Sequence, residues 1–126
     1  MQARVVEMRP WTRIVSRAYG VDPGILEAVC AWETGMQGLR GPGGCWGPGQ
    51  VSWAVWGRTL AREGIAGQPE ALLRPWVGVW AAARVLAAWQ RQVGRDRAVC
   101  AYNGAGARRR CPYRDGVEAM RRRLGR

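Results

Sequence analysis

Apolar residues at helical spacing, interrupted by glycine and proline, constrain the fold of this chain more than any other feature. The first such pattern covers residues 4–19 and ends at Gly20. Asp22-Pro23 then supplies an N-cap and a proline at the first helical position, which predicts a second helix as far as Thr34-Gly35. The apolar face of that helix is predicted to comprise Ile25, Leu26, Ala28, Val29 and Trp32.

The rest of the chain follows the same pattern, and strand signals are nearly absent. We predict a glycine-rich loop over 35–49, a helix over 51–61, a short turn over 69–73, a long helix over 75–93, a short helix over 97–102 and a last helix from 112 to about 124. Trp76, Trp80 and Trp89 of the long helix are expected in the core. A chain of 126 residues is the size of one domain, so the prediction is a single all-α domain, 1–126.

The charge of the chain is strongly positive, at +11, and concentrates at the C-terminal end. Residues 101–126 hold eight arginines against two acidic residues. Such an end is typical either of a solvated helix face or of a surface that binds a polyanion such as nucleic acid, anionic lipid or a wall polymer. No recognisable nucleic-acid motif accompanies it, so sequence-specific nucleic acid is not an expected partner.

Histidine is absent, which excludes Ser-His-Asp and Cys-His catalysis and any histidine metal site. Cysteines occur at Cys30, Cys45, Cys100 and Cys111 without a CxxC pair, so no structural zinc is expected. The sequence leaves open whether they are free thiols or disulfides. No cofactor or metal is implied.

No apolar run is long enough to cross a membrane, and residues 1–10 lack the apolar centre of a signal peptide. The expectation is a protein made in the cytoplasm without a secretory signal.

Glu33 is the first candidate for chemistry. It lies at the C-terminal end of an apolar helix and immediately before the glycine-rich loop. Burial and the negative end of the helix dipole both raise the pKa of such a carboxyl, as a general acid requires. A helix-end glutamate paired with an arginine is the alternative.

Two further stretches combine polar side chains with glycines. In the first, Gln50 follows Trp46 and three glycines; its amide can both donate to and accept from a sugar, and the indole can stack on one. In the second, Tyr102-Asn103 ends a short apolar helix. Each alone would be an ordinary loop or cap.

Together and in this order, these segments resemble the catalytic domain of lytic transglycosylases and goose-type lysozymes. The resemblance covers almost the whole chain. Residues 17–34 resemble the family's opening helix pair, which ends in a catalytic Glu-Ser, and Gly44, Gly47 and Gln50 match its GA-x-GLMQ-I pattern. Further along, 82–86 resemble its GARYL segment, 98–104 match its A-x-x-A-YN-x-G pattern, and Tyr113 with Val117 fit its late Y-x-x-x-V. It implies a lysozyme-like helical domain with a glycine-rich active-site loop.

The resemblance also implies a role for each matched residue. Glu33 would be the single general acid and base, and the substrate-binding residues would be Thr34, Trp46, Gln50, Tyr102, Asn103 and Tyr113. Thr34 stands where the family has serine and keeps its hydroxyl. Pro48-Gly49 replaces Leu-Met, which removes a hydrophobic contact with the substrate.

The implied substrate is the glycan strand of peptidoglycan, cut between N-acetylmuramic acid and N-acetylglucosamine by a monomeric enzyme. Most glycosidases need a second carboxylate. The remaining candidates, Glu63, Glu70, Asp96, Asp115 and Glu118, lie outside the matching segments, which favours the route that forms a 1,6-anhydro product.

We expect this enzyme to be a phage endolysin or a virion- or secretion-associated protein that opens the wall after release or delivery. Two alternatives stay open: a water-using muramidase on the same fold, or a non-catalytic basic helical module that binds wall or nucleic acid. The arginine-rich end would hold the protein to anionic envelope polymers or lipids.

Overall fold

A computed structural model describes residues 3–126 and is built of helices around one very small sheet. The elements are α1 (Ala3–Tyr19), α2 (Pro23–Thr34), η1 (Pro42–Gly44), β1 (Cys45–Trp46), β2 (Val51–Ser52), α3 (Trp53–Arg62), η2 (Pro69–Leu73), α4 (Pro75–Val93), α5 (Arg95–Tyr102) and α6 (Pro112–Arg123). The predicted all-α class is confirmed at this level. None of the helices described in 3–126 combines the length and apolarity that crossing a membrane requires.

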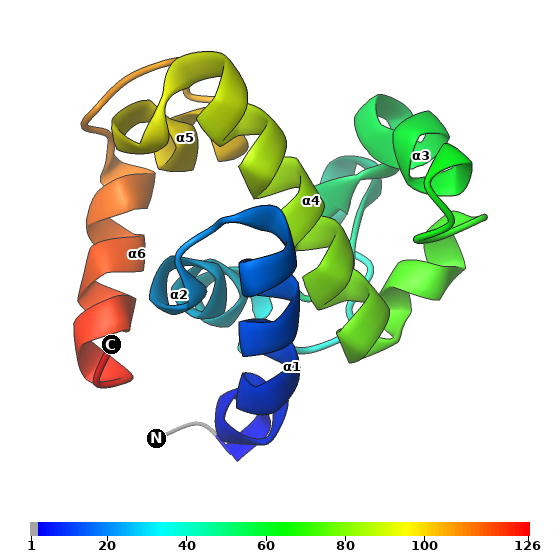
Figure 1. The fold of residues 1–126 in the computed structure, drawn as a ribbon, viewed down its shortest axis with the longest axis horizontal. Coiled ribbons are helices and arrows are strands. Elements are labelled where there is room, and N and C mark those ends of the chain that lie inside the picture. Colours follow the sequence, from blue (N-terminus) through cyan, green and yellow to red (C-terminus); the bar gives the residue numbers. More distant parts are fainter. Residues whose placement is uncertain (1–2) are drawn as a thin grey trace.

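Helix α4 is the central element of the molecule. Figure 1 shows it passing through the middle, with α1, α2, α5 and α6 toward one side and α3 with the short strands toward the other. Its buried face includes Ala81, Ala82 and Ala83, which are fully inaccessible. Small side chains let neighbouring helices approach closely, and α1, α2 and α5 all contact α4.

Local capping signals set where the helices begin. The carboxylate of Asp22 accepts hydrogen bonds from the backbone N–H groups of Gly24 at 2.7 Å and Ile25 at 3.3 Å, so α2 starts at the proline between them. Helices α4 and α6 also begin at prolines, Pro75 and Pro112. All three predicted starts are confirmed.

The predicted helix over 51–61 is wrong in its first two residues. Val51 and Ser52 form β2, which pairs antiparallel with β1 in the register Trp46↔Val51. The Ser52 hydroxyl then accepts a hydrogen bond from the backbone N–H of Val55 at 3.3 Å, and this cap starts α3 at Trp53. This pairing depends on β1, a separate segment of the chain, and the helical periodicity of residues 51–61 carries no information about it.

Two tryptophans expected to be covered are half exposed instead. Trp76, predicted for the core, is 47% exposed because it lies in the first turn of α4, with one edge against the ring of Trp11. The Trp11 indole N–H donates to the carbonyl oxygen of Trp76 at 2.6 Å. Trp32, predicted for the apolar face of α2, is 46% exposed. Trp80 and Trp89, by contrast, pack against the core.

The four cysteines, whose state the sequence left open, divide evenly. Cys100 in α5 and Cys111 before α6 form a disulfide, whereas Cys30 and Cys45 are free thiols. Cys30 is buried in α2, and Cys45 in β1 is partly covered.

A buried ion-pair cluster joins both ends of the described chain to α2. Glu27, which is fully buried, accepts hydrogen bonds from Arg9 of α1 at 2.9 and 3.0 Å and from Arg126 at 3.2 Å. Arg9 also donates to the carbonyl oxygen of Leu124 at 2.8 Å. Each carboxylate oxygen therefore faces a guanidinium, which a buried charge requires.

Candidate active site

Glu33 lies in the last turn of α2, where the helix ends abruptly. Gly35 adopts a left-handed conformation with φ 68°, and its N–H bonds to the carbonyl oxygen of Ala31 at 2.8 Å. The next residue, Met36, is fully buried and bonds back to the carbonyl of Cys30 at 3.1 Å. This double closure fixes the end of the helix, and with it the direction of the Glu33 side chain.

The Glu33 carboxyl is mostly enclosed and has one hydrogen-bond partner among residues 3–126. The hydroxyl of Tyr113, from the start of α6, donates to Oε2 at 2.7 Å. Burial raises the pKa of Glu33, and the Tyr113 hydrogen bond lowers it by a smaller amount. The net upward shift is in the direction expected from the sequence and suits a group that donates a proton near neutral pH.

Tyr102 lies near Glu33 and fixes the glycine-rich loop. Its hydroxyl donates to the carbonyl oxygen of Gly49 at 2.7 Å. Burial raises the pKa of Tyr102 well above its usual value, and the neighbouring Cys30, Glu33 and Cys45 raise it further. Burial likewise raises the pKa of Tyr113, with Tyr102 and Glu33 contributing. Both phenols therefore stay protonated and act as hydrogen-bond donors.

Thr34 joins the end of α2 to the same loop. Its hydroxyl donates to the carbonyl oxygen of Pro48 at 2.9 Å and accepts a hydrogen bond from the backbone N–H of Gln37 at 3.0 Å. A serine could make both contacts, so the hydroxyl is the essential feature. The structure thus gives Thr34 a role in holding the loop beside Glu33.

Gln50 is bound within the loop. Its backbone has a φ of 50°, which is uncommon for a residue with a side chain. The side-chain amide donates to the carbonyl oxygens of Leu39 and Gly47, both at 3.1 Å. Its Oε1 lies so close to Gly41 that a Cβ there would be 1.7 Å away. Gln50 therefore organises the loop, with its amide nitrogen bound to two carbonyl oxygens and its Oε1 packed against Gly41.

Trp46 and Asn103, also predicted to bind substrate, are less directly connected to Glu33. Trp46 is only 9% exposed in the small sheet, and the guanidinium of Arg40 lies 4.8 Å from its ring centre. Asn103 is exposed at the end of α5, next to Tyr102, and within residues 3–126 its side chain makes no hydrogen bond. Glu33, Thr34, Tyr102 and Tyr113 thus form the centre of the site, with Gln50 in its adjoining loop.

Two cysteine thiols lie beside the same centre. A Cβ on Gly49 would be 3.7 Å from the Cys30 sulfur and 2.6 Å from the Tyr102 hydroxyl, which places both groups against one loop residue. Burial raises the pKa of Cys30 and of Cys45, and the charge of Glu33 raises each further. Neither thiol is activated as a nucleophile.

Trp32 is a feature of the site's surroundings that sequence reasoning misplaced. It precedes Glu33 in α2, and its ring lies against Gly116 of α6, where a Cβ would be 2.4 Å from the indole. Gly116 follows Tyr113 by about one helical turn. Helices α2 and α6 therefore contact each other at two neighbouring places, Glu33 with Tyr113 and Trp32 with Gly116. The sequence feature that could have indicated this contact is the position of a large aromatic residue next to the candidate acid.

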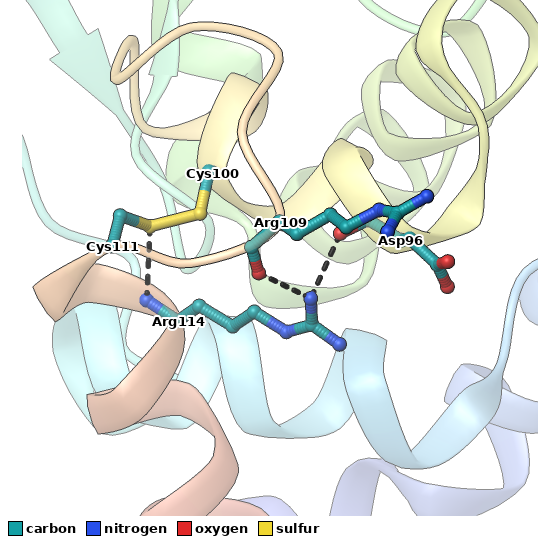
Figure 2. Close-up of a disulfide and its surroundings, with 5 residues drawn as sticks. All are labelled: Asp96, Cys100, Arg109, Cys111 and Arg114. Carbon is teal, nitrogen blue, oxygen red and sulfur yellow. Dashed lines mark hydrogen bonds between the residues drawn. A yellow bond between two sulfur atoms is a disulfide. The ribbon is translucent and has the colours of Figure 1, made fainter.

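The five candidates for a second carboxylate are used elsewhere or lie apart. Glu63 pairs with Arg84 at 2.6 Å, and Glu70 is exposed in η2. The other three line a polar cavity of about 370 Å³ beside α5 and α6, together with Arg109, Arg110 and Arg114: they are Asp96, Asp115 and Glu118. Figure 2 shows Asp96, Arg109 and Arg114 at this place. None of the five hydrogen-bonds to Glu33 in the described structure.

No group of three or more metal-ligating side chains within residues 3–126 could hold a metal ion. Comparisons with protein-family models, with curated proteins and with solved structures found no match to this chain.

Proposed function

We propose that this protein cleaves the glycan strands of peptidoglycan between N-acetylmuramic acid and N-acetylglucosamine, with Glu33 as its single general acid and base. The proposal includes a lysozyme-like arrangement of the helices and a glycine-rich loop that contacts the substrate. It rests on the sequence resemblance together with the surroundings of Glu33.

The observation that carries the proposal is the environment of one carboxyl group. Glu33 is mostly buried, its pKa is raised by that burial, and a neutral Tyr113 hydroxyl contacts it at 2.7 Å. No arginine pairs with it in the described structure, in contrast to Glu27 and Glu63. This argues against the alternative that Glu33 is an ordinary helix-end member of an ion pair.

The reaction would use both protonation states of Glu33. The protonated carboxyl donates its proton to the oxygen that bridges the two sugars, and the C–O bond breaks as positive charge develops at the anomeric carbon. The resulting carboxylate then takes a proton from the attacking hydroxyl. Glu63 is paired with Arg84, and Asp96, Asp115 and Glu118 line a cavity to which Glu33 does not contribute. We therefore favour the sugar's own 6-hydroxyl as the nucleophile, with a 1,6-anhydromuramic acid end as the product.

Mass spectrometry of muropeptides released from purified peptidoglycan tests this directly. The wild type is compared with Glu33→Gln and with Glu70→Gln, which makes the same chemical change at an exposed site. We expect 1,6-anhydro ends from the wild type and Glu70→Gln and none from Glu33→Gln. Ends heavier by one water would identify a muramidase. No release by the wild type from several wall types would contradict the proposal and leave a non-catalytic wall- or nucleic-acid-binding module.

The arginine-rich end is proposed to hold the protein to anionic envelope polymers or lipids. Five of its arginines are exposed, namely Arg108, Arg109, Arg110, Arg122 and Arg123. Arg114, Arg121 and Arg126 instead make contacts within the protein: Arg121, for example, pairs with Asp22 at 3.1 Å. The five exposed arginines therefore form the surface to which a polyanion would bind.

Adsorption to purified walls at increasing salt tests that surface. Replacing Arg122 and Arg123 with glutamine is expected to weaken adsorption and its salt dependence while leaving the product unchanged. An unchanged salt dependence would contradict the proposed surface. In this proposal the protein acts as a monomer and reaches the wall after release from the cytoplasm, as a phage lysis or secretion-associated enzyme would.

A further inference from the structure

Tyr102 and Tyr113, the two phenols of the site, each follow one half of the same disulfide by two residues. Tyr102 follows Cys100 by two residues in α5, and Tyr113 follows Cys111 by two residues at the start of α6. One phenol bonds to Gly49 of the loop and the other to Glu33. The covalent bond therefore links the backbones that carry both donors of the site.

The disulfide also forms part of the start of α6. The Cys111 sulfur accepts a hydrogen bond from the backbone N–H of Arg114 at 3.4 Å, in the position of an N-cap. The Arg114 guanidinium donates to the carbonyl oxygens of Asp96, at 2.8 Å, and of Arg109. Figure 2 shows these contacts side by side with the disulfide. Together they hold the first turn of α6 against α5.

The far end of α6 is anchored independently. Arg121 pairs with Asp22, and beyond the helix Arg126 pairs with the buried Glu27. The segment before α6, in contrast, is exposed at Arg108, Arg109 and Arg110. Breaking the disulfide would therefore loosen the end of α6 that carries Tyr113, where the Arg114 contacts remain, while the ion pairs retain the other end.

We propose that the Cys100–Cys111 disulfide is the positioning element that holds Tyr102 and Tyr113 around Glu33, so that activity depends on this bond being formed. The inference rests on the proposed function for its effect on cleavage. Its effect on Glu33 itself does not depend on any substrate.

The charged and titratable groups that face Glu33 come from four elements: Cys30 of α2, Cys45 of β1, Tyr102 of α5 and Tyr113 of α6. Of these, Tyr113 is the hydrogen-bond donor to the carboxylate, and its bond lowers the pKa of Glu33. Displacing Tyr113 removes that stabilisation of the charged form. If the carboxyl stays buried, the pKa of Glu33 should then rise.

The test compares the full chain before and after reduction by dithiothreitol. The S–S bond breaks, two electrons and two protons form two thiols, and the reagent is oxidised to its cyclic disulfide. The pKa of Glu33 is followed by ¹³C NMR of the carboxyl groups, with its signal identified as the one missing from Glu33→Gln. Cleavage kinetics are measured on the same samples, and circular dichroism reports whether the helices persist.

A Cys100→Ala/Cys111→Ser variant repeats the comparison without reductant. Serine is a preferred N-cap, so this change removes the covalent bond while keeping a hydrogen-bond acceptor at the start of α6. Tyr113→Phe supplies the matched control: in that background reduction has no hydrogen bond to displace, and the pKa of Glu33 should not move. Dithiothreitol should have no effect on the double variant.

We expect reduction and the double variant each to raise the pKa of Glu33 and to lower kcat on the order of tenfold, with KM changed less. An unchanged pKa and kcat in the reduced, folded protein would overturn the inference. Loss of the helical signal in both the reduced protein and the double variant would also overturn it, because the bond would then hold the fold rather than the tyrosines. If the oxidised wild type cleaves no glycan, the proposed function fails, and the NMR titration still decides the positioning role.

Discussion

The hydroxyl of Tyr113 lies 2.7 Å from Oε2 of Glu33, although the two residues are 80 positions apart in the chain. This hydrogen bond joins the first turn of α6 to the last turn of α2. It opposes the effect of burial, because it stabilises the charged carboxylate whereas burial destabilises it. The proton affinity of the candidate acid is thus set by two elements that meet only in the folded chain.

Tyr113→Phe should move the alkaline limb of the activity profile to higher pH. Cleavage needs protonated Glu33, so activity falls as pH rises through the pKa of this group. Removing the phenol hydroxyl raises that pKa further, because the charged carboxylate loses a hydrogen bond while burial remains. The profile of kcat/KM against pH measures it. Tyr19→Phe is the control, since Tyr19 bonds to Trp80 at 2.9 Å and not to Glu33; a shift of equal size there would contradict the assignment.

Glu33→Gln should stabilise the protein increasingly as pH rises from acidic to neutral. The pKa of Glu33 is higher in the folded than in the unfolded chain. Its favourable contribution is therefore complete below the unfolded pKa and is lost as pH rises through the folded one. Glutamine does not titrate, and its side-chain oxygen can still accept from Tyr113. We expect the gain to be smallest at acidic pH and largest at neutral pH.

Urea unfolding at several pH values between 4 and 8 measures this gain. Glu70→Gln, at an exposed site, should differ from the wild type by no more than about 0.5 kcal/mol. A Glu33→Gln curve that runs parallel to the wild type across the whole range would show that Glu33 is solvated, against the structure.

Gly49→Ala should both destabilise the protein and disturb the site. A Cβ at this position would lie 2.6 Å from the Cβ of Ala82 in α4 and 2.6 Å from the Tyr102 hydroxyl. Neither neighbour can move without displacing α4 or breaking the bond between Tyr102 and the loop. We expect a loss of about 1–3 kcal/mol in the free energy of unfolding. Gly67→Ala is the control, because nothing lies within 4 Å of its Cβ; equal losses at both positions would contradict the close packing.

The features that sequence predicted well are those decided by neighbouring residues. The starts of α2 and α6 follow from Asp22-Pro23 and from Pro112, because an N-cap and a proline at the first position act within one turn. The placement of Glu33 at the end of α2 follows for the same reason. Here local preference and tertiary packing agree.

The features that sequence did not predict depend on distant partners. Val51 is a strand residue because it pairs with Trp46, and Trp76 is exposed because of where α4 begins relative to α1. The pairing of Cys100 with Cys111 is one of several that four cysteines allow. The contact between Tyr113 and Glu33 likewise required the fold, although the resemblance had selected both residues.

Glu27 is the clearest case of a distant partnership, and it leads to the last prediction. This fully buried carboxylate faces Arg9, 18 positions away, and Arg126, 99 positions away. In Glu27→Gln, two guanidinium groups would remain near a neutral side chain in a largely dry place. Breaking a buried pair in this way typically destabilises by about 3–5 kcal/mol.

Glu63→Gln is the matched control for Glu27→Gln, because Glu63 also binds an arginine through two hydrogen bonds, at 2.6 and 2.8 Å. Its side chain is 35% exposed, however, and a pair open to solvent contributes about 0–1 kcal/mol. In guanidinium chloride unfolding we therefore expect Glu27→Gln to lose several-fold more stability than Glu63→Gln. Since Glu27 joins α1, α2 and the C-terminal residue, its loss should also free Arg126 and loosen the end of α6. Similar small losses in both variants would mean that water reaches Glu27 and that α1, α2 and α6 are held together by apolar packing alone.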